Sequence, residues 1–107
     1  MLPRAQLATV DSALALDKKA WEIALVGHCL AGSEAAWAEL VRTYQGLLLH
    51  VVRRNQTAGI EPAAIVQDVW VSLYSNAPIG LKRFDPERGT RLSTFLIMVA
   101  MTCLKLA

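Results

Sequence analysis

The sequence predicts an all-α fold, a compact bundle of about four main helices. Apolar residues recur at steps of three and four over residues 33–55, which is the spacing of one face of a helix. Breaker residues (glycine, proline and asparagine) stand at the junctions between such segments. Of the 107 residues, 54% are hydrophobic and only 7% aromatic, and alanine and leucine favour helix over strand. The predicted shared core comprises Trp37, Leu40, Tyr44, Val51, Ile65, Val69, Leu73 and Phe95.

The first helix is expected to begin at Asp17. Residues 1–16 have no clear period, so we expect a flexible or partly helical N-terminal arm there. Asp17 can cap the exposed amides of the first turn. Trp21, Leu25 and Cys29 then follow at helical spacing and predict the buried side of this helix.

The second helix is expected from about Ser33 to Asn55. Gly32 supplies a left-handed residue that ends the first helix, and the Ser33 side chain caps the second. Its length is unusual for so small a domain. Its apolar stripe comprises Trp37, Leu40, Val41, Tyr44, Leu47, Leu48 and Val51.

The third helix is expected to open at Glu61 and Pro62, because a proline in the first turn lacks only an N–H that has no partner there anyway. Asn76 is among the residues that end it. Its inner face comprises Ile65, Val69, Leu73 and part of Trp70. Its outer stripe comprises Ala64, Gln67, Asp68 and Val71.

The fourth helix is expected to begin near Thr90 or Ser93, either of which can cap it. The loop before it, residues 81–90, contains a tight turn in which Phe84 is the aromatic anchor. From residue 95 to residue 107, eleven of thirteen residues are apolar, and a helix that is apolar all round is normally buried on every side. A four-helix core covers one side only, so we expect this segment to meet a partner as well.

The net charge is +2, and the charges are unevenly distributed. Residues 1–81 carry six basic and seven acidic side chains, whereas residues 82–107 carry five basic and two acidic ones. This excess of positive charge permits phosphate contact near the C-terminal end. A solvated charged loop is equally compatible with the charge alone.

Several function classes are disfavoured by the sequence. No apolar stretch approaches the ~18 to 20 residues of a membrane span, so we expect a cytoplasmic protein with no membrane partner. His28 and His50 have no carboxylate at a ligand interval, and Cys29 and Cys103 lack the CxxC spacing. No spacing suggests a nucleophile with its base and orienting acid. We therefore expect no catalytic residue, no metal site, no cofactor and no enzyme activity.

Three blocks of the chain form an ordered set of motifs. They are residues 31–44 (AGSEAAWAELVRTY), residues 65–70 (IVQDVW), and residues 84–89 with 92–96 (FDPERG and LSTFL). In order and separation they resemble the second conserved region of bacterial RNA polymerase sigma factors, where GDEEAFAELVRRY, LVQEVF, FDPERG and FSTYL are typical. The resemblance covers about residues 23–107, and the extracytoplasmic-function (ECF) type is the nearest subgroup.

The resemblance implies a sigma region 2-like helical domain over residues 17–107 that joins the RNA polymerase core enzyme. In the family, the helix that carries the VQE segment docks on the clamp helices of the β′ subunit. The matching residues are Gln67 and Asp68, with Ala64 and Val71 on the same stripe, and Ala64 stands where the family has an acidic residue. A carboxylate at this place can pair with arginines of a partner helix, and a solvated helix face is the alternative interpretation.

The resemblance also implies contact with the −10 element of a promoter. The candidate residues are Arg88, Arg91, Phe95, Thr102 and Lys105. Phe95 can stack on an unpaired base, although a core aromatic is the alternative. Met98 and Met101 stand where the family displays basic, polar and aromatic residues, and methionine binds neither a phosphate nor a base edge. We therefore expect this chain alone to bind promoter DNA weakly.

Two interpretations of the function remain open. The first is a transcription initiation factor domain that binds polymerase and contacts promoter DNA. The second is a sigma-like protein-interaction module that has lost DNA binding and uses residues 95–107 to dimerise or to bind an anti-sigma factor. The family's region 4 domain, a helix-turn-helix that reads the −35 element, is absent from this chain, so we expect a fragment of a longer factor or a shortened relative.

Overall fold

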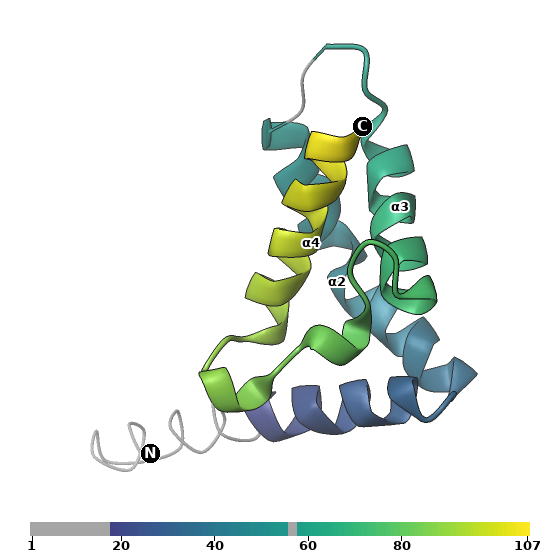
Figure 1. Cartoon of the computed structure of the whole chain (residues 1–107), viewed down its shortest axis with the longest axis vertical. Coiled ribbons are helices and arrows are strands. Elements are labelled where there is room, and N and C mark those ends of the chain that lie inside the picture. The colour runs from purple at the N-terminus through teal and green to yellow at the C-terminus, as the bar shows by residue number, and fades with distance from the viewer. Residues whose placement is uncertain (1–17, 56–57) are drawn as a thin grey trace, which may run out of the picture.

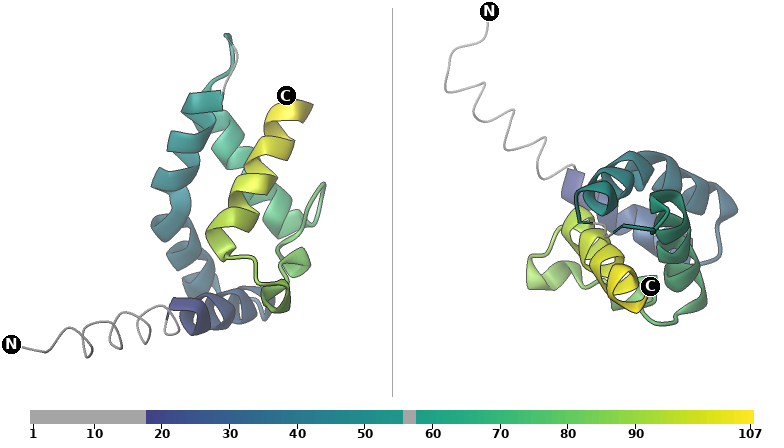
Figure 2. Two further views of the ribbon diagram at one scale, coloured as in Figure 1. Left: turned by 90° about the vertical axis from the view of Figure 1, so that its left-hand side faces the viewer. Right: turned by 90° about the horizontal axis from the view of Figure 1, so that it is seen from above.

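The structure is a computed structural model and describes residues 18–55 and 58–107. In these ranges every regular element is a helix, which confirms the predicted all-α fold. Three long helices run up, down and up beside one another, and a helix over residues 18–30 lies across their lower ends (Figures 1 and 2). The N-terminal arm expected over residues 1–16 lies outside the described residues, as does Asp17. The labelled elements are α2 (Glu34–Asn55), α3 (Pro62–Ser75), η1 (Leu81–Arg83), η2 (Pro86–Arg88) and α4 (Leu92–Leu106).

The start of α2 follows the predicted local signals. Gly32 has φ 95°, a left-handed conformation that ends the helix before it. The Ser33 hydroxyl oxygen then accepts a hydrogen bond from the Ala36 N–H at 3.1 Å, which caps α2.

The buried stripe of α2 differs from the predicted one. Trp37, Val41, Leu47 and Val51 are only half-buried, whereas Ala36 and Val52 are buried. The buried residues recur every fourth position, so the stripe drifts around the helix as α2 crosses its neighbours and reaches residue 52 in place of residue 51. The buried residues of α2 are Ala36, Leu40, Tyr44, Leu48 and Val52.

The helix α3 begins and ends as predicted, with Glu61 as its N-cap and Asn76 in a left-handed conformation after its last turn. Its inner residues Ile65, Val69 and Leu73 are buried. The buried Ser72 hydroxyl donates to the Ile79 carbonyl at 2.8 Å and accepts from the Ile79 N–H at 3.0 Å. This pair of bonds holds the chain that leaves α3 against the helix.

The apolar helix α4 finds most of its partners inside the domain. It packs on both α2 and α3, so two sides of the helix are covered and not the single side that we expected. Among its large apolar side chains, Met98 and Leu106 are the exposed ones. The buried residues of α4 are Leu92, Phe95, Leu96, Val99, Ala100 and Cys103.

The N-terminus of α4 is capped by a residue distant in sequence. The expected cap at Thr90 or Ser93 is wrong: the N-cap residue is Arg91, which makes no capping bond with its own side chain. The carboxylate of Glu22, on the helix over residues 18–30, accepts hydrogen bonds from the Leu92 N–H (3.5 Å) and from Arg91 Nη2 (2.8 Å) and Nε (3.0 Å). A negative charge at this position is also favoured by the dipole of α4.

Glu22 thereby changes the expected orientation of the first helix. Its side chain is buried, with the residue 4% exposed, and Tyr44 Oη of α2 donates to it at 3.4 Å. Leu25 and Cys29 are buried as predicted, but the neighbouring Trp21 is exposed, so its assignment to the buried side was wrong. The physical reason is that the Glu22 carboxylate, which accepts four hydrogen bonds, makes the contact between this turn and the bundle, and the Trp21 ring does not.

We predict that Tyr44→Ala lowers the free energy of unfolding by about 3 kcal/mol, the cost of removing a buried aromatic side chain. Tyr44 is 8% exposed and packs in the core. Tyr74→Ala is the matched control, because Tyr74 is 71% exposed and its removal should cost much less. Urea denaturation followed by circular dichroism measures both, and equal stability of the two variants would contradict the predicted core.

We also predict that the domain loses stability as the pH falls through the acid range. Burial acts to raise the pKa of Glu22, but the hydrogen bond and charge of Arg91, with the Leu92 N–H and the Tyr44 hydroxyl, hold that pKa below its ordinary value. Because the folded pKa is depressed, the stabilisation is present above the unfolded pKa, about 4.3, and is lost as the pH drops through the folded value. Glu22→Gln removes this titration, so the stability difference between wild type and variant should shrink between pH 6 and pH 3. A difference that stays constant would refute the assignment.

Candidate functional site

The outer stripe of α3 presents the four residues predicted for polymerase binding. Ala64, Gln67, Asp68 and Val71 are all exposed, and they lie opposite the buried inner face of the same helix. Val71 is 56% exposed, which is unusual for a valine in the middle of a helix. The stripe therefore offers an amide, a carboxylate and an apolar side chain on one surface.

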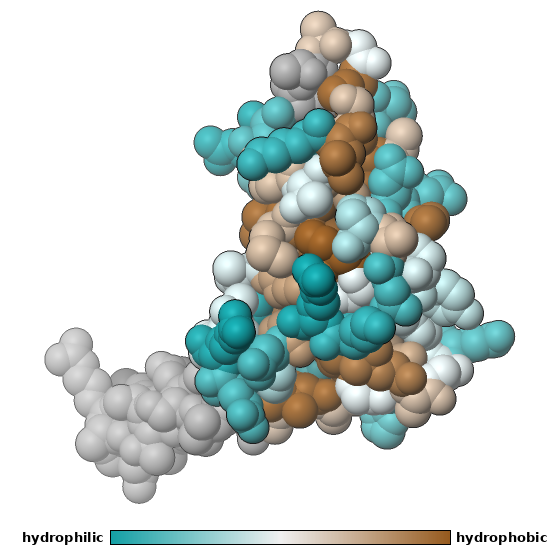
Figure 3. Space-filling view, viewed as in Figure 1, coloured by the Kyte–Doolittle hydropathy of each residue, from teal (hydrophilic) through white to brown (hydrophobic). Residues whose placement is uncertain are grey.

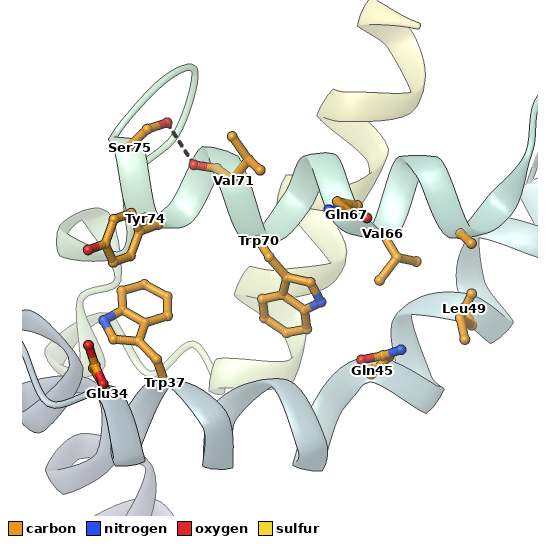
Figure 4. A pocket seen from close by; sticks show the side chains of 11 residues that line it. Glu34, Trp37, Gln45, Leu49, Val66, Gln67, Trp70, Val71, Tyr74 and Ser75 are labelled. Atoms are coloured by element: carbon orange, nitrogen blue, oxygen red, sulfur yellow. Dashed lines mark hydrogen bonds between the residues drawn. The ribbon is translucent and has the colours of Figure 1, made fainter.

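A groove of about 660 Å³ runs between α2 and α3 beside this stripe (Figure 4). Gln67 and Val71 belong to both the stripe and the groove. At one end the rings of Trp37 and Tyr74 make an edge-to-face contact with their centroids 5.3 Å apart, and Trp37 Nε1 donates to the Cys29 carbonyl at 3.0 Å. The other residues that line the groove are Glu34, Gln45, Leu49, Ala63, Val66, Trp70 and Ser75.

Trp70 supplies an unused hydrogen-bond donor to the groove. Its indole N–H is buried and has no acceptor among the described residues. Figure 4 shows the ring between α2 and α3, with its nitrogen directed along the groove toward Gln45. A buried donor without a partner costs about 1–3 kcal/mol, so a partner that brings an acceptor to Trp70 gains binding energy.

The opposite side of the α3 stripe borders a crevice of about 230 Å³ between α3 and α4. Asp68 and Val71 line it on α3, and Cys103 and Leu106 line it on α4. Burial, and then the charge of Asp68, raise the pKa of the Cys103 thiol, so this thiol stays protonated at neutral pH. Of the described residues that line the groove and the crevice, Glu34 and Asp68 carry charge and none is basic. The outer stripe of α3 therefore lies between two largely apolar depressions on an acidic surface.

A second surface lies where the loop with η1 and η2 meets α4. There a hollow of about 720 Å³ has two arginines on its wall, Arg83 and Arg88. Figure 3 shows hydrophilic side chains over this loop and hydrophobic ones along α4. The residues that line the hollow are Arg83, Phe84, Asp85, Arg88, Thr90, Thr94, Phe95 and Met98.

The two aromatic rings of the hollow are core residues. Phe84 and Phe95 are tilted against each other at 48°, with their centroids 5.6 Å apart. Phe84 is buried, as expected for the anchor of the turn, and Gly89 with φ 78° reverses the chain after η2. Phe95 is 5% exposed, so most of the ring is already used in packing.

The structure brings together only some of the residues predicted to contact DNA. Arg88 and Phe95 line the hollow, and Arg88 Nε lies 3.6 Å from Asp85 Oδ2. Arg91 instead turns to Glu22. Thr102 and Lys105 lie further along α4, and the Thr102 hydroxyl donates to the Met98 carbonyl at 3.0 Å.

The sequence that forms most of these surfaces matches a known protein family. The family model of sigma-70 region 2 matches residues 40–104, which is more than half of the chain. The chain belongs to the sigma-70 region 2 family. It is therefore a sigma factor domain that acts in transcription initiation, as the three motif blocks predicted. The match includes α3, the loop and most of α4, whereas the helix over residues 18–30 lies outside it.

Other comparisons add no relative to this sigma domain. No curated protein and no solved structure shows significant similarity to it. Among the described residues, no helix combines the length and the apolar character that crossing a membrane requires.

Several residues of these surfaces are not among the predicted site residues. Thr90 and Thr94 line the hollow, and Trp70 and Tyr74 line the groove. A signal existed for Tyr74, because it follows Gln67 and Val71 at helical spacing. For the hollow, the basic residues of the loop were visible, but no sequence pattern states which of them face α4.

Proposed function

We propose that this sigma domain docks on the RNA polymerase core through α3 and holds an unpaired strand of the promoter −10 element beside α4. The observation that carries the proposal is the exposed α3 stripe with an apolar depression on each side. The outer stripe of α3 and the hollow are formed by different elements, so polymerase and DNA can occupy them at the same time. The family supports a role in transcription initiation, and the surfaces of this chain suggest how the role is divided between them.

For the polymerase, the partner that fits best is a helix with apolar and basic side chains. Val71 and Tyr74 offer exposed apolar surface that such a helix would cover. Asp68 and Glu34 would pair with its arginines, and the Trp70 indole would find an acceptor. The family resemblance implies that this partner is the pair of clamp helices of the β′ subunit.

For DNA, the hollow offers cations on its wall and apolar side chains for a base. Arg83 and Arg88 can reach phosphates, and the Thr94 hydroxyl can donate to a phosphate or a base edge. Phe84 and Phe95 expose too little surface for full stacking, so Met98, which is exposed, provides most of the apolar contact. Because Asp85 offsets Arg88, we expect the chain alone to bind a strand weakly.

The alternative, a module that dimerises or binds an anti-sigma factor through residues 95–107, has less surface available. Most apolar side chains of α4 already pack against α2 and α3, and the exposed ones are Met98 and Leu106. These two lie two turns apart, each in a different depression. Sedimentation over a concentration series tests this alternative directly, since a dimer would sediment faster as concentration rises.

We predict that Asp68→Arg reduces recovery of core polymerase by the chain. If the carboxylate pairs with an arginine of the partner, the reversal costs about 2 kcal/mol, or roughly thirtyfold in affinity. Glu39→Arg is the matched control, because Glu39 lies on α2 outside the groove and pairs with Arg42. Pull-down of core polymerase with both variants measures the effect, and equal recovery by Asp68→Arg and Glu39→Arg would remove α3 as the docking site.

We predict that Arg83→Ala and Arg88→Ala each reduce the salt dependence of binding to a fluorescein-labelled oligothymidine strand. Each lost phosphate contact lowers the slope of log K against log salt by about 0.7. Arg54→Ala removes the same charge at the far end of α2, away from the hollow, and should leave the slope unchanged (Figure 1). Fluorescence anisotropy at several salt concentrations gives the slopes. If Arg54→Ala lowers the slope as much as the loop variants do, binding is a general charge effect and the hollow is not the site.

A further inference from the structure

The first helix contributes one buried carboxylate to the base of the DNA-facing surface. Glu22 lies outside the family match, yet its side chain meets the residues that join the loop to α4. It holds Arg91 by two hydrogen bonds and the Leu92 N–H by a third. Arg91 comes directly after the loop, and its carbonyl accepts the Phe95 N–H at 3.1 Å. The point at which the loop becomes the helix is therefore held from outside the family region.

We propose that Glu22 is a positioning residue for the DNA-facing hollow, through its contacts with Arg91 and the N-terminus of α4. The inference rests on the proposed contact of the hollow with an unpaired strand. One wall of the hollow is the loop, with Arg88 and Thr90, and the other is α4, with Thr94 and Met98. Glu22 clamps the residue that connects these two walls, so it sets the distance and angle between them.

The arrangement of donors around Glu22 supports positioning over a simple surface ion pair. Glu22 and Arg91 form a bidentate pair, and Glu22 is only 4% exposed. The geometry of this pair is therefore fixed better than that of a mobile surface ion pair. The bonds from Leu92 and Tyr44 restrain the carboxylate from two further directions. Arg91 keeps the outer edge of its guanidinium free of Glu22, because Nε and Nη2 make the two bonds.

The decisive test uses the sign of the effect of Glu22→Gln on DNA binding. Removing a negative charge from a protein that binds a polyanion raises affinity by long-range electrostatics. Positioning predicts the opposite: a glutamine amide holds Arg91 less firmly, the walls of the hollow separate, and affinity for the oligothymidine strand falls roughly tenfold, the loss of about one base or phosphate contact. Glu87→Gln is the matched control, since Glu87 is an exposed acid of η2 in the same loop and its neutralisation should raise affinity or leave it unchanged.

Two further measurements separate positioning from loss of fold and from loss of the proposed function. Recovery of core polymerase by Glu22→Gln should equal that of wild type, because Glu22 bonds to α2 and to the start of α4, whereas the stripe lies on α3. An unfolded variant would lose both activities. A wild-type chain that binds polymerase but no strand refutes DNA contact itself, before Glu22 is considered. In a double-mutant cycle with Arg91→Lys, which keeps the charge but loses the planar fork, the effect of Glu22→Gln should nearly vanish.

The inference would be overturned by a folded Glu22→Gln protein that binds the strand as well as, or better than, wild type. In that case Glu22 would withhold Arg91 from DNA instead of positioning the hollow. It would also be overturned if the effects of Glu22→Gln and Arg91→Lys simply add, since Arg91 would then act on the strand independently of Glu22. If Glu22→Gln does not fold, the Arg91→Lys variant decides alone. Strand binding that is unchanged in this variant, which has the same net charge, refutes the positioning role of the Glu22–Arg91 contact.

Discussion

A buried carboxylate is the constraint on which the arrangement of this domain depends. Taking the charge of Glu22 out of water is costly, and the cost is offset only where donors meet it from several directions. Those donors come from α2 and from the start of α4, so the helix over residues 18–30 can lie across the bundle in one register. A shift by one residue would move the carboxylate away from these donors. The apolar core stabilises the three long helices, and this polar contact fixes how the first helix meets them.

The parts of the fold that depend on local chemistry were predictable from the sequence. Each of these features depends only on residues that are close in sequence. They are the turn at Gly32 and Ser33, the proline at the start of α3 and the left-handed Asn76 at its end. The cap of α4 was not predictable, because it comes from Glu22, far away in the sequence. The helical period of the sequence also could not show whether Val51 or Val52 is buried, because the helices that cross α2 determine which residues face the core.

The same distinction applies to the two surfaces. The stripe on α3 belongs to a single helix, so helical spacing placed Gln67, Asp68 and Val71 together. The hollow belongs to a loop and a helix, and its membership follows from tertiary contacts. Arg91 shows the difference most clearly: the excess of positive charge suggested a phosphate contact, and a buried acid from the first helix engages it instead.

The separation of the two faces of α3 has an evolutionary consequence. Ile65, Val69 and Leu73 are constrained by the core, because any change of volume there disturbs neighbours on α2 and α4. The outer residues touch little of their own chain, so mutation can alter them without loss of the fold. Ala64, where the family resemblance implies an acidic residue, is a position of this kind. With the proposed docking through α3, the affinity for the partner can therefore be adjusted one exposed residue at a time while the scaffold stays the same.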